Sequence, residues 1–318
     1  MAIRPPILRA GDTIGIVTLG SPLAASVIDS RIETLQSLGF QIAMGRHVYD
    51  ADGFLAGTDR ERADDLMAMF LDPKVRMILP TRGGVGVAGI LPYLDFRAIA
   101  DHPKILSGYS DITVLSNALY QFSNLIGFQS LMLINFSTST PAYNYNQFFT
   151  ATSTITSPRV IGNPPGMPLA SLVPGNVTGP IVGGNLTSFT DTLGTPYEFD
   201  TLGKILVLEE TAEPINKVYR MLNRLKLAGK LDDCIGIVMG QCTDCTAAYG
   251  VTYQDLIREV LVPLGKPLMT NLATAHGTYK SAIPLGARAN LNTAANTFTI
   301  LEPTVSIEAQ GPAANTFY

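Results

Sequence analysis

Three residue types that together perform nucleophilic catalysis occur in this chain, and the serine among them has a distinctive position. Ser110 follows a short apolar run and precedes a segment with apolar residues at helical spacing, so we expect it at a strand-to-helix corner. The first backbone N–H groups of a helix have no partner within the helix. A hydroxyl there could cap the helix, which is the commoner role of serine, or act as a nucleophile whose oxyanion those groups stabilise. The stretch is not the hydrolase elbow G-x-S-x-G, because Ile112 occupies the second glycine position.

Glu209 and His276 are the candidate partners of Ser110. Glu209 follows the apolar run from Ile205 to Leu208, and alternation along a strand places Glu209 and Glu210 on opposite faces. His276 lies between an apolar run and a glycine-containing loop, whereas the other two histidines have polar surroundings. Considered singly, Glu209 is more simply interpreted as a solvated carboxylate at a strand end, and His276 as a structural or exposed histidine.

A glycine-rich loop is the second chemical signal. Gly84, Gly86 and Gly89 match the dinucleotide-binding pattern G-x-G-x-x-G and follow a predicted strand. The match is not at the first strand, however, and Pro92 interrupts the helix that should follow. We therefore expect these glycines to let the backbone approach a ligand or to present N–H groups. A non-hydrolytic NAD-binding protein is the alternative from a different functional class.

The elements that would position these residues alternate between strand and helix patterns. Strands are predicted over 13–19, 40–43 and 75–80, and helices over 26–38 and after the capping-box sequence at 58–61. This alternation is typical of a mostly parallel sheet covered by helices. Ligands bind at the carboxyl ends of the strands in such sheets, where Ser110 and the glycine loop both lie.

The composition changes after residue 136, which indicates a second domain. Residues 137–170 are rich in Ser, Thr, Asn and Pro and are predicted to be a linker. Residues 171–318 read as a β-rich domain with helices over 216–227 and 253–261. The polar tail after Ile300 is expected to fray.

Composition excludes several classes of partner. The 318 residues are 46% hydrophobic and 15% charged, which is typical of a folded globular chain. A net charge of -4 without basic runs gives no reason to expect nucleic acid. No apolar stretch approaches the roughly 18 residues of a membrane span, and the first apolar run is too short for a signal peptide. We expect a cytoplasmic protein.

The three cysteines are Cys234, Cys242 and Cys245, of which the last two form a single C-x-x-C. A zinc site needs more ligands at suitable spacing, and the chain has only three histidines. We therefore predict ordinary reduced thiols and no metal site.

Short motifs recur in a fixed order along the chain. They are L-x-x-GDTIG at 8–15, RGG-x-G at 82–86, LDF at 94–96, PK at 103–104, GYSDIT at 108–113, GGNL at 183–186, LGTP at 193–196, LE at 208–209, RML at 220–222, and His276 followed by PLG at 284–286. This ordered set resembles the L,D-carboxypeptidase family of serine peptidases, which includes murein tetrapeptide carboxypeptidases and microcin C immunity proteins. The similarity extends from about Leu8 to Ile300.

This resemblance implies an α/β fold with an N-terminal Rossmann-like parallel-sheet domain and a smaller β-rich C-terminal domain. It implies Ser110 as the nucleophile, His276 as the general base and Glu209 as the residue that orients His276. The oxyanion would be held by backbone N–H groups of Gly83, Gly84 and Asp111. Arg82 and Asn185 are the candidate substrate-binding residues.

The implied reaction is hydrolysis of an L,D-peptide bond in a small murein-derived peptide, without metal or cofactor. The alternative hydrolase is an amidase of microcin C-type peptidyl-adenylates. Family members are commonly dimeric, which implies a homodimer. The chain lacks Trp, which disfavours a pocket in which Trp stacks on a nucleobase.

Three departures from the family pattern concern the pocket and not the triad. The family usually has His-Gly-Pro-Met where this chain has Gln129-Ser130-Leu131-Met132. Val85 occupies a position that is often aromatic, and Tyr219 replaces an aspartate.

Overall fold

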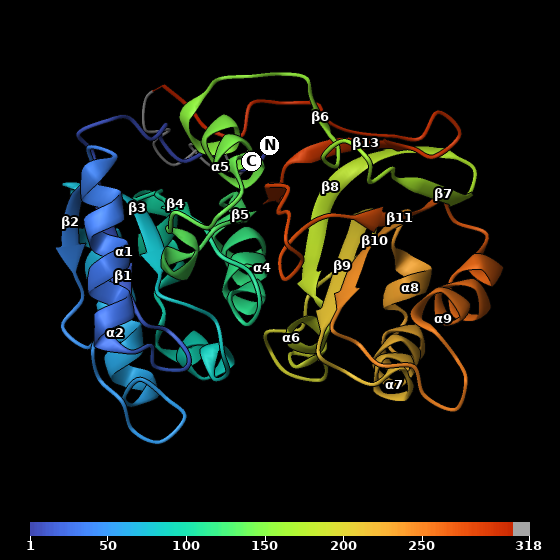
Figure 1. Ribbon diagram of the computed structural model, residues 1–318, viewed down its shortest axis with the longest axis horizontal. Helices are drawn as coiled ribbons and strands as arrows, with labels where there is room; N and C mark the ends of the chain where they lie inside the picture. The colour runs from blue at the N-terminus through green and yellow to red at the C-terminus, as the bar shows by residue number, and fades with distance from the viewer. Residues whose placement is uncertain (308–318) are drawn as a thin grey trace, which may run out of the picture.

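Four parallel strands form the sheet of the N-terminal domain in the computed structural model, which describes residues 1–307. The strand order is β2-β1-β3-β4, with β1 (Thr13–Val17), β2 (Gln41–Met44), β3 (Val75–Pro80) and β4 (Ile105–Leu106). The remaining elements are α1 (Ala25–Ser37), α2 (Asp59–Leu71), the 3₁₀ helix η1 (Val87–Tyr93), α3 (Phe96–Asp101) and α4 (Ile112–Ser123). The predicted parallel α/β domain is confirmed (Figure 1).

The start of α2 illustrates how local sequence sets an element boundary. The Thr58 hydroxyl accepts from the backbone N–H of Glu61, and the Glu61 carboxylate accepts in return from the N–H of Thr58. This reciprocal capping box supplies partners for backbone groups that a helix leaves unpaired. Leu66 and Phe70 are both fully buried one turn apart, so the cap also aims the apolar face at the sheet.

The C-terminal sheet has eight strands in the order β6-β14-β13-β8-β9-β10-β11-β7. The central strands β8 to β11 run parallel, and the outer strands pair antiparallel. The resemblance implied a smaller second domain, but its sheet is the larger of the two. Its strands are β6 (Arg159–Ile161), β7 (Ala170–Val173), β8 (Asn176–Asn185), β9 (Ile205–Thr211), β10 (Gly236–Thr243), β11 (Leu268–Leu272), β13 (Arg288–Asn292) and β14 (Thr297–Ile300).

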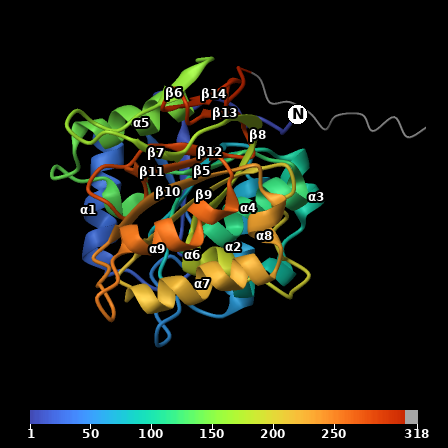
Figure 2. The same ribbon diagram turned by 90° about the vertical axis from the view of Figure 1, so that its right-hand side faces the viewer.

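The helices of the second domain lie beside this sheet. These helices are α6 (Leu186–Thr190), α7 (Ile215–Leu227), α8 (Lys230–Asp233), α9 (Tyr253–Val260) and the 3₁₀ helix η3 (Val262–Leu264). Figure 2 shows α7, α8 and α9 on the outer side of the sheet, away from the N-terminal domain.

The segment 137–170 contains more regular structure than a linker was expected to have. It follows the short 3₁₀ helix η2 (Leu133–Asn135) and includes α5 (Ala142–Ser153) as well as β6. Strand β6 pairs with β14 at the edge of the C-terminal sheet. Phe148 of α5 is fully buried, so the segment contributes to the core as well as connecting the domains.

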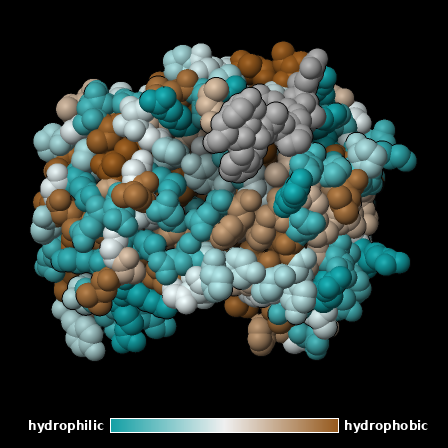
Figure 3. All heavy atoms as spheres, turned by 180° about the vertical axis from the view of Figure 1, so that it is seen from behind, coloured by the Kyte–Doolittle hydropathy of each residue, from teal (hydrophilic) through white to brown (hydrophobic). Residues whose placement is uncertain are grey.

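The two domains are joined by direct hydrogen bonds. Strand β5 (Gly127–Gln129) of the first pairs antiparallel with β12 (Ile283–Leu285) of the second. Asn117 of α4 donates to the carbonyl of Gly183 in β8 and accepts from its N–H. Helix α4 therefore lies between the two sheets (Figure 1). The space-filling view from behind shows an outline indented at the lower edge, where the domains meet (Figure 3).

The end of the chain departs from the expected frayed tail as far as residue 307. The N–H of Ser306 donates to Pro5, and its carbonyl accepts from Ile7. Glu302 forms an ion pair with Arg4, with 3.1 Å between the charged atoms. Contacts with residues 4–7 near the N-terminus thus hold this part of the tail. The rest of the predicted fraying, over 308–318, falls outside the described residues.

The prediction of reduced thiols is wrong for two of the three cysteines. Cys242 and Cys245 form a disulfide, whereas Cys234 is a buried free thiol. The chain turns after β10 through Asp244, whose φ of 56° is left-handed, and the two Cα atoms lie 5.4 Å apart. That spacing is within the range that a disulfide requires. Within residues 1–307, no group of three or more His, Cys, Asp or Glu side chains is arranged to hold a metal ion.

No helix in the described part of the chain has both the length and the apolar character needed to cross a bilayer.

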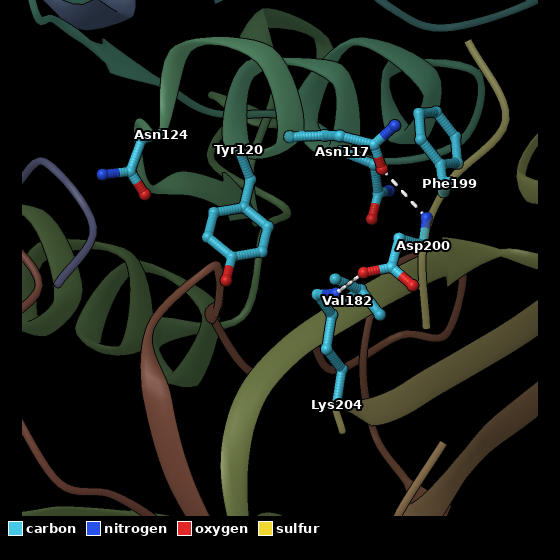
Figure 4. A pocket seen from close by; sticks show the side chains of 8 residues that line it. Asn117, Tyr120, Asn124, Val182, Phe199, Asp200 and Lys204 are labelled. Carbon is cyan, nitrogen blue, oxygen red and sulfur yellow. Dashed lines mark hydrogen bonds and ion pairs between the residues drawn. The ribbon is translucent and has the colours of Figure 1, made fainter. Parts of the chain in front are cut away.

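A cavity of about 370 Å³ lies between the domains beside the later turns of α4. Figure 4 shows Asp200 and Lys204 paired on the wall opposite Tyr120, and the N–H of Asp200 donates to Gln121. The cavity begins at Asn117 and reaches Asn124, so along α4 it lies roughly 10–20 Å beyond Ser110 at 1.5 Å per residue. It is separate from the site described below.

Lys104 at the start of β4 makes the stability of the fold depend on pH. Its ammonium is buried and donates to the carbonyls of Asp72 and Val75 at 2.7 and 2.6 Å. Burial lowers the pKa of Lys104 to about 8. Between that value and the ordinary lysine pKa, the unfolded chain holds a proton that the folded chain has released, so stability rises with pH.

We expect the free energy of unfolding of the wild type, relative to Lys104→Met, to rise by up to about 3 kcal/mol between pH 8 and 10.5. Urea unfolding at several pH values measures this difference. Lys74→Met, which removes an exposed lysine nearby, is the control for loss of a charge. A difference that stays constant over this pH range would contradict the assignment.

Candidate active site

Ser110 occupies a strained position at the corner before α4. Its φ is 62°, in the left-handed region that residues with a Cβ rarely adopt. The N-cap of α4 is Asp111, not Ser110, and no side-chain hydrogen bond caps this helix. The Ser110 hydroxyl has no hydrogen-bond partner among the described residues. Helix capping, the commoner role for a serine at this place, therefore does not explain Ser110.

Gly83 packs directly against Ser110, and no larger residue would fit. A Cβ added to Gly83 would lie 2.8 Å from the Cβ of Ser110 and 2.9 Å from the backbone nitrogen of Asp111. Gly84 and Gly86 have left-handed φ values of 87° and 105°. The loop then continues into the 3₁₀ helix η1, so the α-helix N-terminus that holds a dinucleotide pyrophosphate is missing. Gly83 instead brings its backbone against Ser110.

Asp111 ties this glycine loop to α4 and to the second domain. Its carboxylate accepts from the N–H of Val87 at 2.8 Å and from the hydroxyl of Ser188 in α6 at 3.2 Å. Burial is the main cause that raises the pKa of Asp111, partly opposed by these bonds. Within residues 1–307 the backbone N–H groups of Gly83, Gly84 and Asp111 donate no hydrogen bond. They are available to a ligand atom.

Glu209 and His276 form a hydrogen-bonded pair. The Nδ1 atom of His276 lies 2.8 Å from Oε2 of Glu209. The Glu209 side chain is 1% exposed and the His276 side chain 17%, so the carboxylate is enclosed and the imidazole reaches the surface. A buried carboxylate on Nδ1 fixes the tautomer in which Nε2 can accept a proton.

The predicted division between Glu209 and Glu210 is confirmed. Glu210 points to the other side of β9, where its carboxylate accepts from Asn185 Nδ2 at 2.9 Å and from the hydroxyl of Thr187 at 2.7 Å. It is 2% exposed and holds the start of α6. Of two adjacent buried carboxylates, one faces the histidine and the other has a structural role.

Tyr109 connects the serine of the first domain with the histidine of the second. Its ring meets the His276 ring edge-on, with 5.2 Å between the centroids and 88° between the planes. Since Tyr109 is the neighbour of Ser110, this contact brings the histidine to the serine corner. Ser110 itself is not hydrogen-bonded to His276 here, and such bonds are often long until substrate binds. Sequence reasoning missed Tyr109, although its place beside Ser110 was a signal.

The sequence and the fold of this chain have known counterparts. Residues 14–130 match the family described as LD-carboxypeptidase N-terminal domain, and residues 178–291 match LD-carboxypeptidase C-terminal domain. A relative named probable murein peptide carboxypeptidase, from Bacillus subtilis, is 36% identical over 93% of this chain and 94% of its own length. This chain belongs to the LD-carboxypeptidase family.

The names of other relatives indicate two different functions, self-immunity and carboxypeptidase activity. The microcin C7 self-immunity protein MccF of Escherichia coli is 28% identical over 95% of this chain and 96% of its own. A muramoyltetrapeptide carboxypeptidase from Oxalobacter formigenes has a solved structure that covers 92% of this chain and all of its own, with a TM-score of 0.80 and 27% identity. The mixed α/β fold is thus the fold of the family.

The two candidate substrate-binding residues differ in what their side chains do. Arg82 of this LD-carboxypeptidase family member is half-buried, and within residues 1–307 its guanidinium has no hydrogen bond or ion pair. Arg82 adjoins Gly83, which packs against Ser110. Burial raises the pKa of Tyr109, and the charge of Arg82 is among the effects that partly oppose this rise. Asn185 is 5% exposed, and its amide and carbonyl bind Glu210 and Ser188. Both residues stay predictions as substrate contacts, and they differ in that the polar atoms of Asn185 already have partners inside the protein.

The stretch that departs from the family pattern lies against the histidine loop. Gln129 is buried, and its Nε2 donates to the hydroxyl of Thr274, two residues before His276, at 3.2 Å. Its Oε1 and the hydroxyl of Ser130 are buried without a partner in the described part of the chain. This departure therefore lies inside the protein, beside the loop that carries His276.

Proposed function

We propose that this chain is a serine carboxypeptidase that hydrolyses the bond between an L-centre and a C-terminal D-amino acid in murein-derived peptides. The observation that carries the proposal is the Glu209–His276 hydrogen bond, linked through Tyr109 to the strained Ser110 corner. The relatives named murein peptide carboxypeptidases support the choice of substrate. We propose that the protein acts in the cytoplasm as a homodimer, for which light scattering should give twice the mass of the chain.

Each residue of the proposed triad has one task. His276 takes the proton of the Ser110 hydroxyl through Nε2 as the oxygen attacks the scissile carbonyl. Glu209 holds the other ring nitrogen and stabilises the imidazolium that forms. His276 then protonates the leaving amine of the D-amino acid, and a water molecule hydrolyses the acyl-enzyme with the histidine again as base.

The oxyanion of the tetrahedral intermediate would be held by the backbone N–H groups of Gly83, Gly84 and Asp111. These groups have no partner within residues 1–307. Gly83 lies against Ser110, Gly84 is the next residue of the same loop, and Asp111 follows Ser110 in the chain. Fixed donors aimed at the developing charge are a large contribution to catalysis in acyl transfer. The glycine loop thus has a use in hydrolysis and needs no dinucleotide.

Arg82 would bind the terminal carboxylate that defines a carboxypeptidase substrate. A guanidinium without an internal partner, next to Gly83, suits a carboxylate one residue beyond the scissile bond. We expect Arg82→Gln to lower kcat/KM for a free tetrapeptide by about 10–100-fold, the value of a hydrogen bond to a charged group.

The same substitution should change the rate little when the C-terminus of the peptide is amidated, because the charge that Arg82 binds is then absent. Arg97→Gln, which removes an exposed arginine, is the control and should behave as the wild type with both peptides. Equal losses on the acid and the amide would show that Arg82 does not bind the carboxylate.

Release of D-alanine from a murein tetrapeptide is the experiment that tests the proposed function. A peptidyl-adenylate of the microcin type should be assayed in parallel, because MccF is among the relatives. Preference for the tetrapeptide supports the carboxypeptidase, and preference for the adenylate supports the amidase. The absence of Trp leads us to expect the first result.

A further inference from the structure

Lys280 is a buried ammonium beside the histidine loop with no acidic partner. It is 8% exposed, and its Nζ donates to the carbonyls of Ala275 at 2.6 Å and Gly277 at 2.5 Å. No ion pair involves Lys280 within residues 1–307. A charged group is costly to bury unless its hydrogen bonds are made. Here the two carbonyls that satisfy it belong to the residues on either side of His276.

The loop that Lys280 holds is strained next to the histidine. Ala275 has a left-handed φ of 53°, which costs about 1 kcal/mol or more and persists only when surrounding contacts enforce it. The carbonyls of Ala275 and Gly277 both point at one ammonium, so the ammonium constrains the backbone on either side of the residue that carries the imidazole. The N–H of Lys280 also donates to Asn144, which anchors the lysine to α5.

The same ammonium lies over the ring of Tyr109. The distance from Nζ to the ring centroid is 5.2 Å, within the range of a cation–π interaction. That ring also makes the edge-to-face contact with the His276 ring, and its hydroxyl accepts from Asn135 at 3.1 Å. Lys280 therefore contacts both the histidine loop of the second domain and the tyrosine next to Ser110 of the first.

We propose that Lys280 is a positioning residue that holds the His276 loop and Tyr109 in register across the boundary between the domains. This inference rests on the proposed function of His276 as the base. Lys280 does not contact substrate in this proposal, because its protons are directed at two carbonyls and a ring face. Burial lowers the pKa of Lys280 to about 8, opposed in part by the charge of Glu209, which agrees with an enclosed ammonium.

The test compares Lys280→Met with Lys104→Met. Both replace a buried lysine whose ammonium donates to two backbone carbonyls, but Lys104 precedes β4, at the other end of that strand from the Ser110 corner. We expect Lys280→Met to lower kcat for D-alanine release by about 10–100-fold, with KM changed less than about threefold, as for a misplaced catalytic group. Lys104→Met should retain the wild-type kcat.

A second readout does not depend on activity. The chain has three histidines, so the ring ¹⁵N resonances of His276 can be assigned by substitution of the other two. We expect these resonances to shift in Lys280→Met and to stay in place in Lys104→Met. If the wild type releases no D-alanine, the proposed function fails, while the resonances still test the role of Lys280.

Lys280→Gln guards against misfolding of the methionine variant, because its amide can still donate to one of the two carbonyls. Its kcat should lie between those of the wild type and Lys280→Met. A wild-type kcat together with unshifted His276 resonances in either folded variant would overturn the proposal. Loss of thermal stability without a change in these two readouts would also overturn it, since that is the result of a merely structural lysine.

Discussion

Ser110→Ala should lower kcat for the release of D-alanine by about 10⁶-fold, the loss seen when a triad nucleophile is removed. The change deletes one hydroxyl oxygen that has no hydrogen-bond partner in the described structure, so nothing in the fold depends on it. Alanine and serine meet similar strain at a φ of 62°. Thermal unfolding should therefore differ little from that of the wild type, and only the rate should fall.

Ser116→Ala is the matched control for this experiment. Ser116 lies in α4, is fully buried, and its hydroxyl also has no partner within residues 1–307. Its removal should leave kcat within about twofold of the wild type, as for a substitution away from functional groups. Comparable activity in Ser110→Ala and the wild type would exclude a serine nucleophile. Tight binding of NAD(H) by titration would then favour the non-hydrolytic alternative.

Glu209→Gln should lower kcat by about 10⁴-fold, as expected when the residue that orients a catalytic histidine loses its charge. Glutamine has nearly the same shape as glutamate, so the contact with His276 can survive. The amide does not stabilise an imidazolium, however, and its NH₂ group can select the wrong tautomer. The pH dependence of kcat and the kinetics of D-alanine release measure the loss.

Glu210→Gln is the control, since it removes the adjacent buried carboxylate. Glu210 accepts bonds from Asn185 and Thr187 and does not contact the histidine. We expect a lower melting temperature and a kcat within about tenfold of the wild type, because buried bonds to a charged group are lost without a change at His276. Equal losses of kcat in both variants would contradict the assignment of Glu209 as the orienting residue.

The bounds of individual helices and strands could be predicted because they depend on interactions between residues close together in the chain. The period of apolar residues predicted α1 and β3 within one or two residues, and the capping box predicted the start of α2. The alternation of side chains along β9 separated Glu209 from Glu210. The family resemblance, carried by motifs along nearly the whole chain, is confirmed by the comparisons.

What could not be predicted involves partners far apart in the chain. The order of eight strands, the pairing of β6 with β14 and the bonds of Ser306 to the N-terminus depend on contacts between distant segments. The Cys242–Cys245 disulfide was missed for a different reason, because the left-handed turn at Asp244 has no signal in residue spacing.

The sequence by itself determined the residue types of the candidate site and the local elements that carry them. It placed Ser110 before a helix, Glu209 at the end of a strand and His276 in a loop, since each depends on its immediate neighbours. Only the tertiary structure decided which of these meet. The Glu209–His276 bond spans 67 residues, and the contact of Tyr109 with His276 spans the boundary between domains. Lys280 had no signal at all in the sequence, because its partners are backbone carbonyls and a ring face, and any residue can supply a carbonyl.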